Sequence, residues 1–135
     1  MTLLGDHPLN PILPAQDGDR ARAHYRDVLG LELVSGPDQD PMMFRAGGGS
    51  VIVLSELPDR TPPPYPVVSF LVTGIERLTD ELAARGVEFV PLGAGSFAGV
   101  EGVGRGRIMD FGAVKSSWFR DSEGNVLALN EIVAG

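Results

Sequence analysis

Residues 118–132, "WFRDSEGNVLALNEI", decide the fold, because a second stretch of the chain has the same pattern. The turn-forming cluster DSEGN separates two apolar runs, which predicts a β-hairpin. Residues 43–57, "MFRAGGGSVIVLSEL", align with this stretch without gaps. The identical positions are Phe44/Phe119, Arg45/Arg120, Gly49/Gly124, Val51/Val126, Leu54/Leu129 and Glu56/Glu131. This internal repeat predicts that the chain contains a duplicated unit.

The segments before the two hairpins also share a pattern. In each, a short apolar strand precedes a segment with apolar residues at helical spacing, and a glycine, Gly30 or Gly86, ends the helix before another strand. We therefore expect an α+β fold in a single domain spanning residues 1–135. It would contain a βαβββ module at 8–57, a Pro-rich linker at 58–66 and a second βαβββ module at 67–133. The glycine-rich stretch 91–112 is predicted to be irregular, either a mobile lid or a poorly ordered connection.

Composition excludes several classes of protein. The 135 residues include 43% apolar residues, enough for a core, and no cysteine, which rules out disulfides and thiolate metal sites. No apolar run approaches about 18 residues, so we expect neither a membrane span nor membrane binding. We expect the protein to be located in the cytoplasm. A net charge of -7 disfavours nucleic acid and would attract a cationic small molecule.

Three features together resemble a known superfamily: Asp17, the helix phrase "ARAHYRDVLG" at 21–30, and "FRDSEGNVLAL" at 119–129. The chain is similar to the glyoxalase, bleomycin-resistance protein and extradiol dioxygenase superfamily, also called vicinal oxygen chelate proteins. The resemblance implies two duplicated βαβββ modules in a curled, mostly antiparallel eight-stranded sheet around a cavity, with the helices outside. It also implies a homodimer. It does not by itself give a function, because the superfamily contains isomerases, oxygenases, thiol transferases, lyases and drug-binding proteins.

Enzymes of this superfamily hold a divalent metal with four side chains that point into the cavity. Carried onto this chain, the resemblance places these positions at Asn10, Val53, Val67 and Ala128. Valine and alanine have no donor atom, and a single amide oxygen cannot hold a first-row metal. We therefore expect no metal and no cofactor.

Other polar residues do not restore the metal site. His7 would require a shifted first strand, and His24 falls on the predicted first helix. Glu56 and Glu131 each lie three residues beyond a metal position, so strand alternation sends them to the opposite face, where we expect them to be solvated.

Alternation along the two hairpins also predicts which residues line the cavity. Trp118 and the serines would share one face, whereas Phe44 and Phe119 would lie on the other, against the helices. Together with the four former metal positions, the predicted ligand-binding residues are Asn10, Met43, Val53, Ser55, Val67, Ser116, Trp118, Ala128 and Asn130. Such a mostly apolar lining with a few polar groups is typical of a small-molecule site.

The favoured hypothesis is a metal-free protein that binds a small, aromatic or cationic, antibiotic-like molecule by stacking on Trp118. The alternative is a lyase, isomerase or dioxygenase that uses a relocated metal, through His7 and a carboxylate, or a metal-free acid or base. No catalytic residue can be named, because no His, Asp or Glu is predicted on the cavity face. A third hypothesis is a remnant of the fold that acts only through protein contacts.

Overall fold

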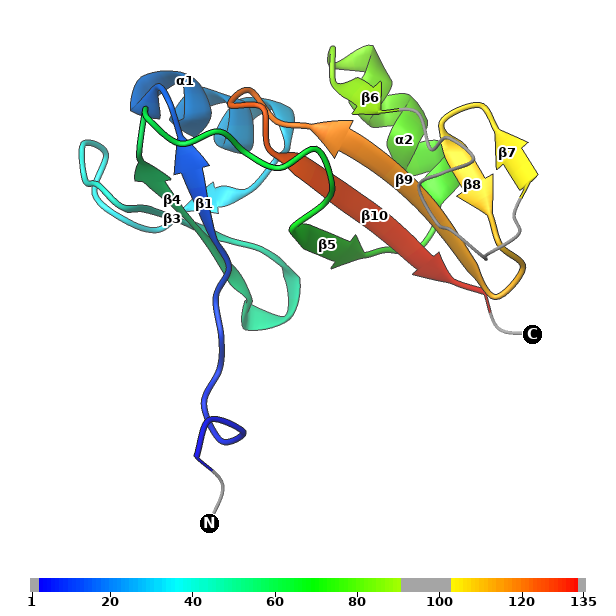
Figure 1. Cartoon of the computed structure of the whole chain (residues 1–135), viewed down its shortest axis with the longest axis horizontal. Helices are drawn as coiled ribbons and strands as arrows, with labels where there is room; N and C mark the ends of the chain where they lie inside the picture. Colours follow the sequence, from blue (N-terminus) through cyan, green and yellow to red (C-terminus); the bar gives the residue numbers. More distant parts are fainter. Residues whose placement is uncertain (1–2, 91–102, 134–135) are drawn as a thin grey trace. The chain divides into compact units, whose positions relative to one another are not determined.

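The computed structural model of the chain describes residues 3–90 and 103–133 (Figure 1). The chain divides into two compact units, residues 1–60 and 61–135. Each unit combines one mixed β-sheet with helical segments, so the predicted α+β class is confirmed.

The first unit contains a four-stranded sheet in the order β1-β4-β3-β2. Its strands are β1 (Ile12–Ala15), β2 (Glu32–Leu33), β3 (Met42–Arg45) and β4 (Val51–Glu56). Strands β1 and β4 are parallel, whereas β4, β3 and β2 are antiparallel neighbours. A short 3-10 turn, η2 (Gly47–Gly49), connects β3 to β4.

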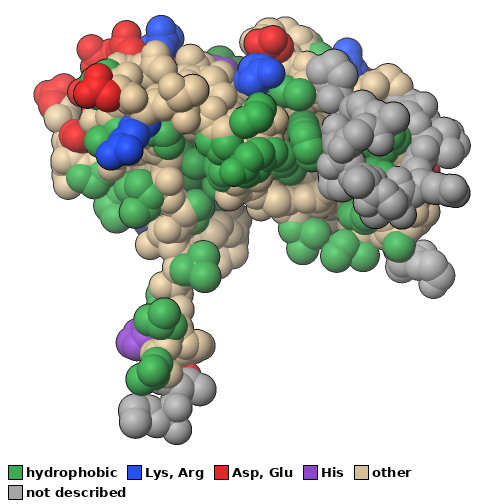
Figure 2. Space-filling view, in the orientation of Figure 1, with side chains coloured by type: hydrophobic (Ala, Val, Ile, Leu, Met, Phe, Trp, Pro, Cys, Tyr) green, Lys and Arg blue, Asp and Glu red, His purple; other side chains and the backbone are tan. Residues whose placement is uncertain are grey.

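The helical segment of the first unit begins at α1 (Gly18–Ala23) and continues as a π-helical turn, η1 (His24–Val28). Asp17 caps its start by accepting a hydrogen bond from the Arg20 backbone N–H at 3.1 Å. Tyr25 is fully buried and its ring packs against Phe44 of β3, with the centroids 5.5 Å apart. Acidic and basic side chains occur together on the exposed side of α1 (Figure 2).

The second unit contains a six-stranded sheet in which β5, β10, β9, β8 and β7 are successive neighbours and β6 also pairs with β9. The strands are β5 (Val68–Leu71), β6 (Glu88–Val90), β7 (Val103–Arg105), β8 (Ile108–Asp110), β9 (Val114–Arg120) and β10 (Val126–Ile132). Strands β6 and β8 lie along the same edge of β9, because β6 pairs with residues 118–120 and β8 with residues 115–116. The order β5-β10-β9-β6 thus matches the order β1-β4-β3-β2 of the first unit.

Part of the glycine-rich stretch is regular, which corrects the prediction for residues 103–110. Strands β7 and β8 form a hairpin joined by Gly106 and Arg107, and Gly106 adopts a positive φ of 64°. A glycine at the first position of a two-residue turn allows this backbone geometry without steric cost. The predicted lid or loose connection at residues 91–102 lies outside the described residues.

Helix α2 (Ile75–Ala84) covers one face of the second sheet. Ile75 and Leu82 are buried on its inner side, as its apolar spacing predicts, and Thr79 is buried between them. No helix in the described part of the chain is long and apolar enough to cross a membrane.

Glu56 and Glu131 occupy equivalent places at the ends of β4 and β10, and neither is simply solvated as predicted. Glu56 Oε1 accepts a hydrogen bond from the Gly18 backbone N–H at 3.0 Å, at the start of α1. The Glu131 carboxylate accepts hydrogen bonds from the backbone N–H groups of Gly74 at 2.9 Å and Ile75 at 3.2 Å, at the start of α2. Helix N-termini have unsatisfied N–H groups and a partial positive charge, so each glutamate stabilises the helix of its own unit.

The turn between β9 and β10 depends on Asp121, which is buried. Its Oδ1 accepts hydrogen bonds from the backbone N–H groups of Glu123 and Asn125, both at 2.8 Å, and Oδ2 accepts one from Asn125 Nδ2 at 2.8 Å. A carboxylate that binds its own backbone in this way fixes the turn and therefore the register of the hairpin.

We expect Glu131→Ala to lower the free energy of unfolding by about 1.5 kcal/mol, because two backbone N–H groups lose a charged acceptor. The matched control is Glu88→Ala, which removes the same charge from an exposed strand residue whose carboxylate is 3.9 Å from Arg120. The control should change stability by less than about 0.5 kcal/mol. Urea unfolding monitored by circular dichroism measures both, and equal effects would show that the Glu131 contacts do not hold α2.

Candidate functional site

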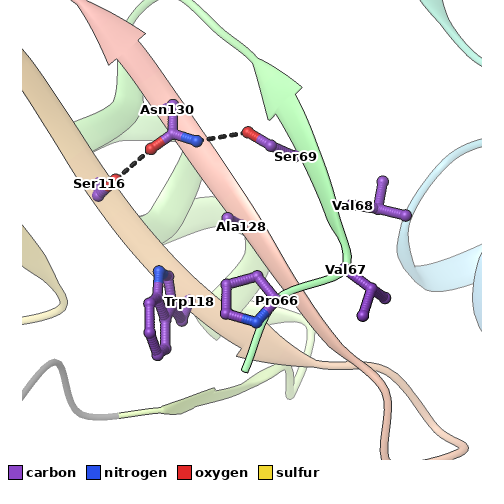
Figure 3. A pocket seen from close by; sticks show the side chains of 8 residues that line it. All are labelled: Pro66, Val67, Val68, Ser69, Ser116, Trp118, Ala128 and Asn130. Carbon is purple, nitrogen blue, oxygen red and sulfur yellow. Dashed lines mark hydrogen bonds between the residues drawn. The ribbon is translucent and has the colours of Figure 1, made fainter. Parts of the chain in front are cut away.

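A pocket of about 310 Å³ opens on the face of the second sheet that does not carry α2 (Figure 3). Strands β5, β9 and β10 supply most of its lining. The residues that line it are Pro66, Val67, Val68, Ser69, Ser116, Trp118, Ala128 and Asn130. Its volume lies at the lower end of the range of about 300–1,000 Å³ typical of small-molecule sites.

The strand register arranges this lining in two levels. At the first level, Ala128 of β10 lies opposite Trp118 of β9 and Ser69 of β5. At the second level, two residues further along β10, Asn130 lies opposite Ser116. Because residues two apart on a strand share a face, both levels face the pocket.

The polar end of the pocket is a hydrogen-bonded row that crosses three strands. Asn130 Oδ1 accepts a hydrogen bond from the Ser116 hydroxyl, and Asn130 Nδ2 donates one to Ser69 Oγ (Figure 3). Ser116 is buried, Asn130 is partly exposed and Ser69 is exposed, so the row runs from the interior to solvent. We call these three residues the Ser–Asn–Ser row.

The apolar end of the pocket contains Trp118. Its side chain packs with Val126 and Ala128, and Val90 packs against this cluster, so that Trp118 is only 9% exposed. Pro66 lines the pocket at this end (Figure 3). A ligand would therefore meet an aromatic and aliphatic surface here and hydrogen-bonding groups at the other end.

No charged side chain lines the pocket among the described residues. Lys115 lies on β9 next to Ser116, but its Nζ donates to the Glu76 carboxylate of α2 at 2.6 Å, and this hydrogen bond raises the pKa of Lys115. Arg107 Nη1 donates to Asp80 at 3.0 Å, and its guanidinium lies over the Phe89 ring. These cations are thus engaged with acidic residues of α2.

Five of the predicted ligand-binding residues come together in this pocket: Val67, Ser116, Trp118, Ala128 and Asn130. The other four lie in the first unit. Met43 of β3 pairs with Val53 of β4, and Ser55 lies two residues further along β4, so these three share a face of the first sheet. Asn10 is exposed and precedes β1, which begins at Ile12. Whether these four residues bind a ligand stays a prediction.

Sequence reasoning missed Ser69. Strand β5 begins at Val68, so the residue that lies opposite Ala128 is Ser69 and not Val67. Strand alternation alone indicates that residues 67 and 69 share a face. It does not indicate which of them lies opposite Ala128, because the register of a parallel pair is not encoded in either strand alone.

The residues at the predicted metal positions do not fit a metal ion. Val53 lies opposite Ile12, and Ala128 lies opposite Ser69. These residues supply one neutral hydroxyl, which is a poor ligand for zinc, iron or manganese. Within residues 3–90 and 103–133, no three His, Cys, Asp or Glu side chains form a group that could hold a metal ion.

Comparisons with known proteins agree with this fold. Residues 8–47 match a family described as bleomycin resistance protein-like N-terminal. No curated protein matches the sequence significantly.

Several solved structures share the fold over almost the whole chain. A protein of Bacillus anthracis assigned to the glyoxalase family has a TM-score of 0.68 and 21% identity, covering 92% of this chain and 93% of that chain. FosX from Listeria monocytogenes, a fosfomycin resistance protein, has a TM-score of 0.67 and 17% identity, covering 94% and 93%. TnmS3 from Streptomyces sp. CB03234, an antibiotic binding protein, has a TM-score of 0.65 and 18% identity, covering 94% and 96%.

The family match over residues 8–47 and the shared fold of these structures agree with the resemblance to the vicinal oxygen chelate superfamily that the sequence shows.

We expect the purified protein to contain far less than one zinc, iron, manganese or nickel ion per chain, and a chelator to leave its melting temperature unchanged. The reason is the donor set at Val53 and Ala128, which offers no anionic or imidazole ligand. Elemental analysis combined with a thermal shift measures both. One tightly bound metal ion per chain would contradict the expectation and would favour a site at other residues.

Proposed function

We propose that this chain is a metal-free small-molecule binding protein whose ligand is antibiotic-like and contains an aromatic ring. The observation that carries the proposal is the pocket of the second unit, which combines Trp118 with the Ser–Asn–Ser row and has no charged lining residue among those described. Ligand sites usually combine apolar walls with a few convergent polar groups, and this lining contains both kinds of group. That a fosfomycin resistance protein and an antibiotic binding protein share the fold supports an antibiotic-like ligand.

The proposal includes the finer architecture that the resemblance implies. The two modules would be duplicates, their strands would form one curled eight-stranded sheet, and the protein would act in the cytoplasm. The shared strand order of the two sheets supports the duplication.

Binding is favoured over catalysis by the chemistry of the lining. General acid–base catalysis needs an imidazole, carboxylate or similar group within hydrogen-bonding distance of the reacting atom. The described lining offers only two serine hydroxyls, one amide and one indole as polar side-chain groups. In the described part of the chain, both serines are hydrogen-bonded to Asn130, and a neutral amide cannot act as the base that would activate a serine as a nucleophile.

The single tryptophan provides a direct test of binding. Trp118 is the only tryptophan of the chain, so its fluorescence reports on this pocket alone. Titration with planar aromatic antibiotics should shift or quench the emission in a saturable manner. Trp118→Phe should weaken the binding of such a ligand by about 1 kcal/mol, measured by calorimetry, because the smaller ring gives less contact area.

Trp118→Phe is preferred to Trp118→Ala, because the indole is mostly buried and its removal would cost about 3–5 kcal/mol of stability. The matched control is Phe89→Leu, which changes an aromatic residue of the same unit that does not line the pocket. Equal affinities of Trp118→Phe and the unchanged protein would remove Trp118 from the site. Absence of any saturable binding would contradict the proposed function.

We also propose that the protein is a homodimer, as the resemblance implies. Leu3, Leu4 and Leu9, before β1, are 75%, 83% and 85% exposed, which is unusual for large aliphatic side chains and suits coverage by a second copy. Sedimentation equilibrium should give twice the chain mass of 14.3 kDa. Leu4→Asp together with Leu9→Asp should shift the protein towards the monomer, and a monomer before substitution would contradict the proposal.

A further inference from the structure

We propose that the pocket of the second unit selects an uncharged planar ligand whose ring lies at the Trp118 end and whose carbonyl-type oxygen accepts hydrogen bonds at the Ser69 end. This inference rests on the proposed function and specifies the ligand class of the same site. It follows from the hydrogen-bonding capacity of the Ser–Asn–Ser row and from the contacts of the described charged residues that adjoin it on β9 and β10.

Counting donors and acceptors along the row shows which groups remain for a ligand. Ser116 uses its only proton in the bond to Asn130 Oδ1, and it is buried. Asn130 Nδ2 uses one of its two protons in the bond to Ser69, so its second N–H remains. Ser69 accepts that bond, and its own hydroxyl proton remains at the exposed end of the row. The accessible end of the row therefore offers donors, which suit a ligand acceptor such as a carbonyl oxygen.

Among the described residues, the charged groups that adjoin the row are already paired with other groups of the second unit. Glu131 follows Asn130 on β10, but its carboxylate binds the N–H groups of Gly74 and Ile75 at the start of α2. Lys115 precedes Ser116 on β9 and binds Glu76 of the same helix. Strand alternation sends both side chains to the face opposite Ser116 and Asn130, in agreement with their contacts at α2.

The net charge of -7 does not change this conclusion. A field of scattered surface charges is screened over about 10 Å at 0.1 M salt, and it can raise the local concentration of a cation without supplying a contact partner. An anion that enters the pocket would exchange water for neutral hydroxyl and amide groups, which is unfavourable. A cation would be attracted only over the face of the Trp118 indole, and Trp118 is only 9% exposed. The lining thus favours an uncharged ligand over the cationic one suggested by overall charge.

Four naphthalene probes of similar shape test the inference. Naphthalene-2-carboxamide is neutral and carries a carbonyl, naphthalene-2-carboxylate is an anion, 2-naphthylmethylammonium is a cation, and 2-methylnaphthalene has no hydrogen-bonding group. The indole N–H of Trp118 gives one signal in a ¹H–¹⁵N spectrum of the full chain, because there is one tryptophan. Titration of each probe against this signal gives its dissociation constant at the pocket.

We expect the carboxamide to bind at least tenfold more tightly than the carboxylate, the ammonium and 2-methylnaphthalene. Ser69→Ala should reduce the preference for the carboxamide over 2-methylnaphthalene severalfold, and Asn130→Leu should abolish it. Ser69 is exposed, so its substitution should leave the fold intact even where Asn130→Leu does not. Ser122→Ala, outside the pocket, serves as the control and should leave the preference unchanged.

The outcomes separate this inference from the proposed function. If the carboxylate or the ammonium binds as tightly as the carboxamide, the uncharged ligand class is wrong, whereas binding at the pocket stands. An unchanged preference in Ser69→Ala would likewise overturn the role of the row. If none of the four probes moves the indole signal at millimolar concentration, both the inference and the proposed small-molecule function are overturned.

Discussion

The structure of each unit depends on one contact, in which a glutamate at the end of the last strand binds the N-terminus of the helix. In the second unit the Glu131 carboxylate accepts hydrogen bonds from Gly74 and Ile75, and in the first unit Glu56 does the same with Gly18. The helix starts a few residues after the first strand, so this contact also keeps the first and last strands side by side as a parallel pair. A parallel pair cannot be joined by a tight turn, and the carboxylate supplies a link that the chain connection does not.

The position of the candidate site follows from that parallel pair. Once β5 lies beside β10 with Ser69 opposite Ala128, and the Asp121 turn fixes β9 on the other side of β10, three polar side chains fall in one row. The row is therefore a product of register and not of a local motif. Its members come from positions 69, 116 and 130, which no sequence window brings together.

The sequence predicted those features that local patterns encode. Apolar periodicity and turn residues over a few positions predicted the two hairpins, the helix faces and the glycines that end the helices. Alternation on one strand pair predicted the shared face of Trp118, Ala128 and Asn130. The hydrogen bonds of Glu56 and Glu131 to the helix starts were not predicted, because their partners lie 38 and 57 positions away in the chain. The β7–β8 hairpin was not predicted, because glycines around its short strands obscure the alternation of apolar and polar residues. Ser69 was not predicted, because the register of the parallel pair β5–β10 depends on the whole unit.

Ala128 connects the proposed absence of a metal ion to the presence of the pocket. The resemblance implies a metal ligand at this position, and a methyl group can neither donate electrons nor reach across the face of the sheet. The same small side chain leaves space between Trp118 on one neighbouring strand and Ser69 on the other, and that space is part of the pocket. A larger apolar residue would also have removed the ligand atom, but it would have filled the pocket. Alanine at this position is thus consistent with the proposed binding of a small molecule without a metal ion.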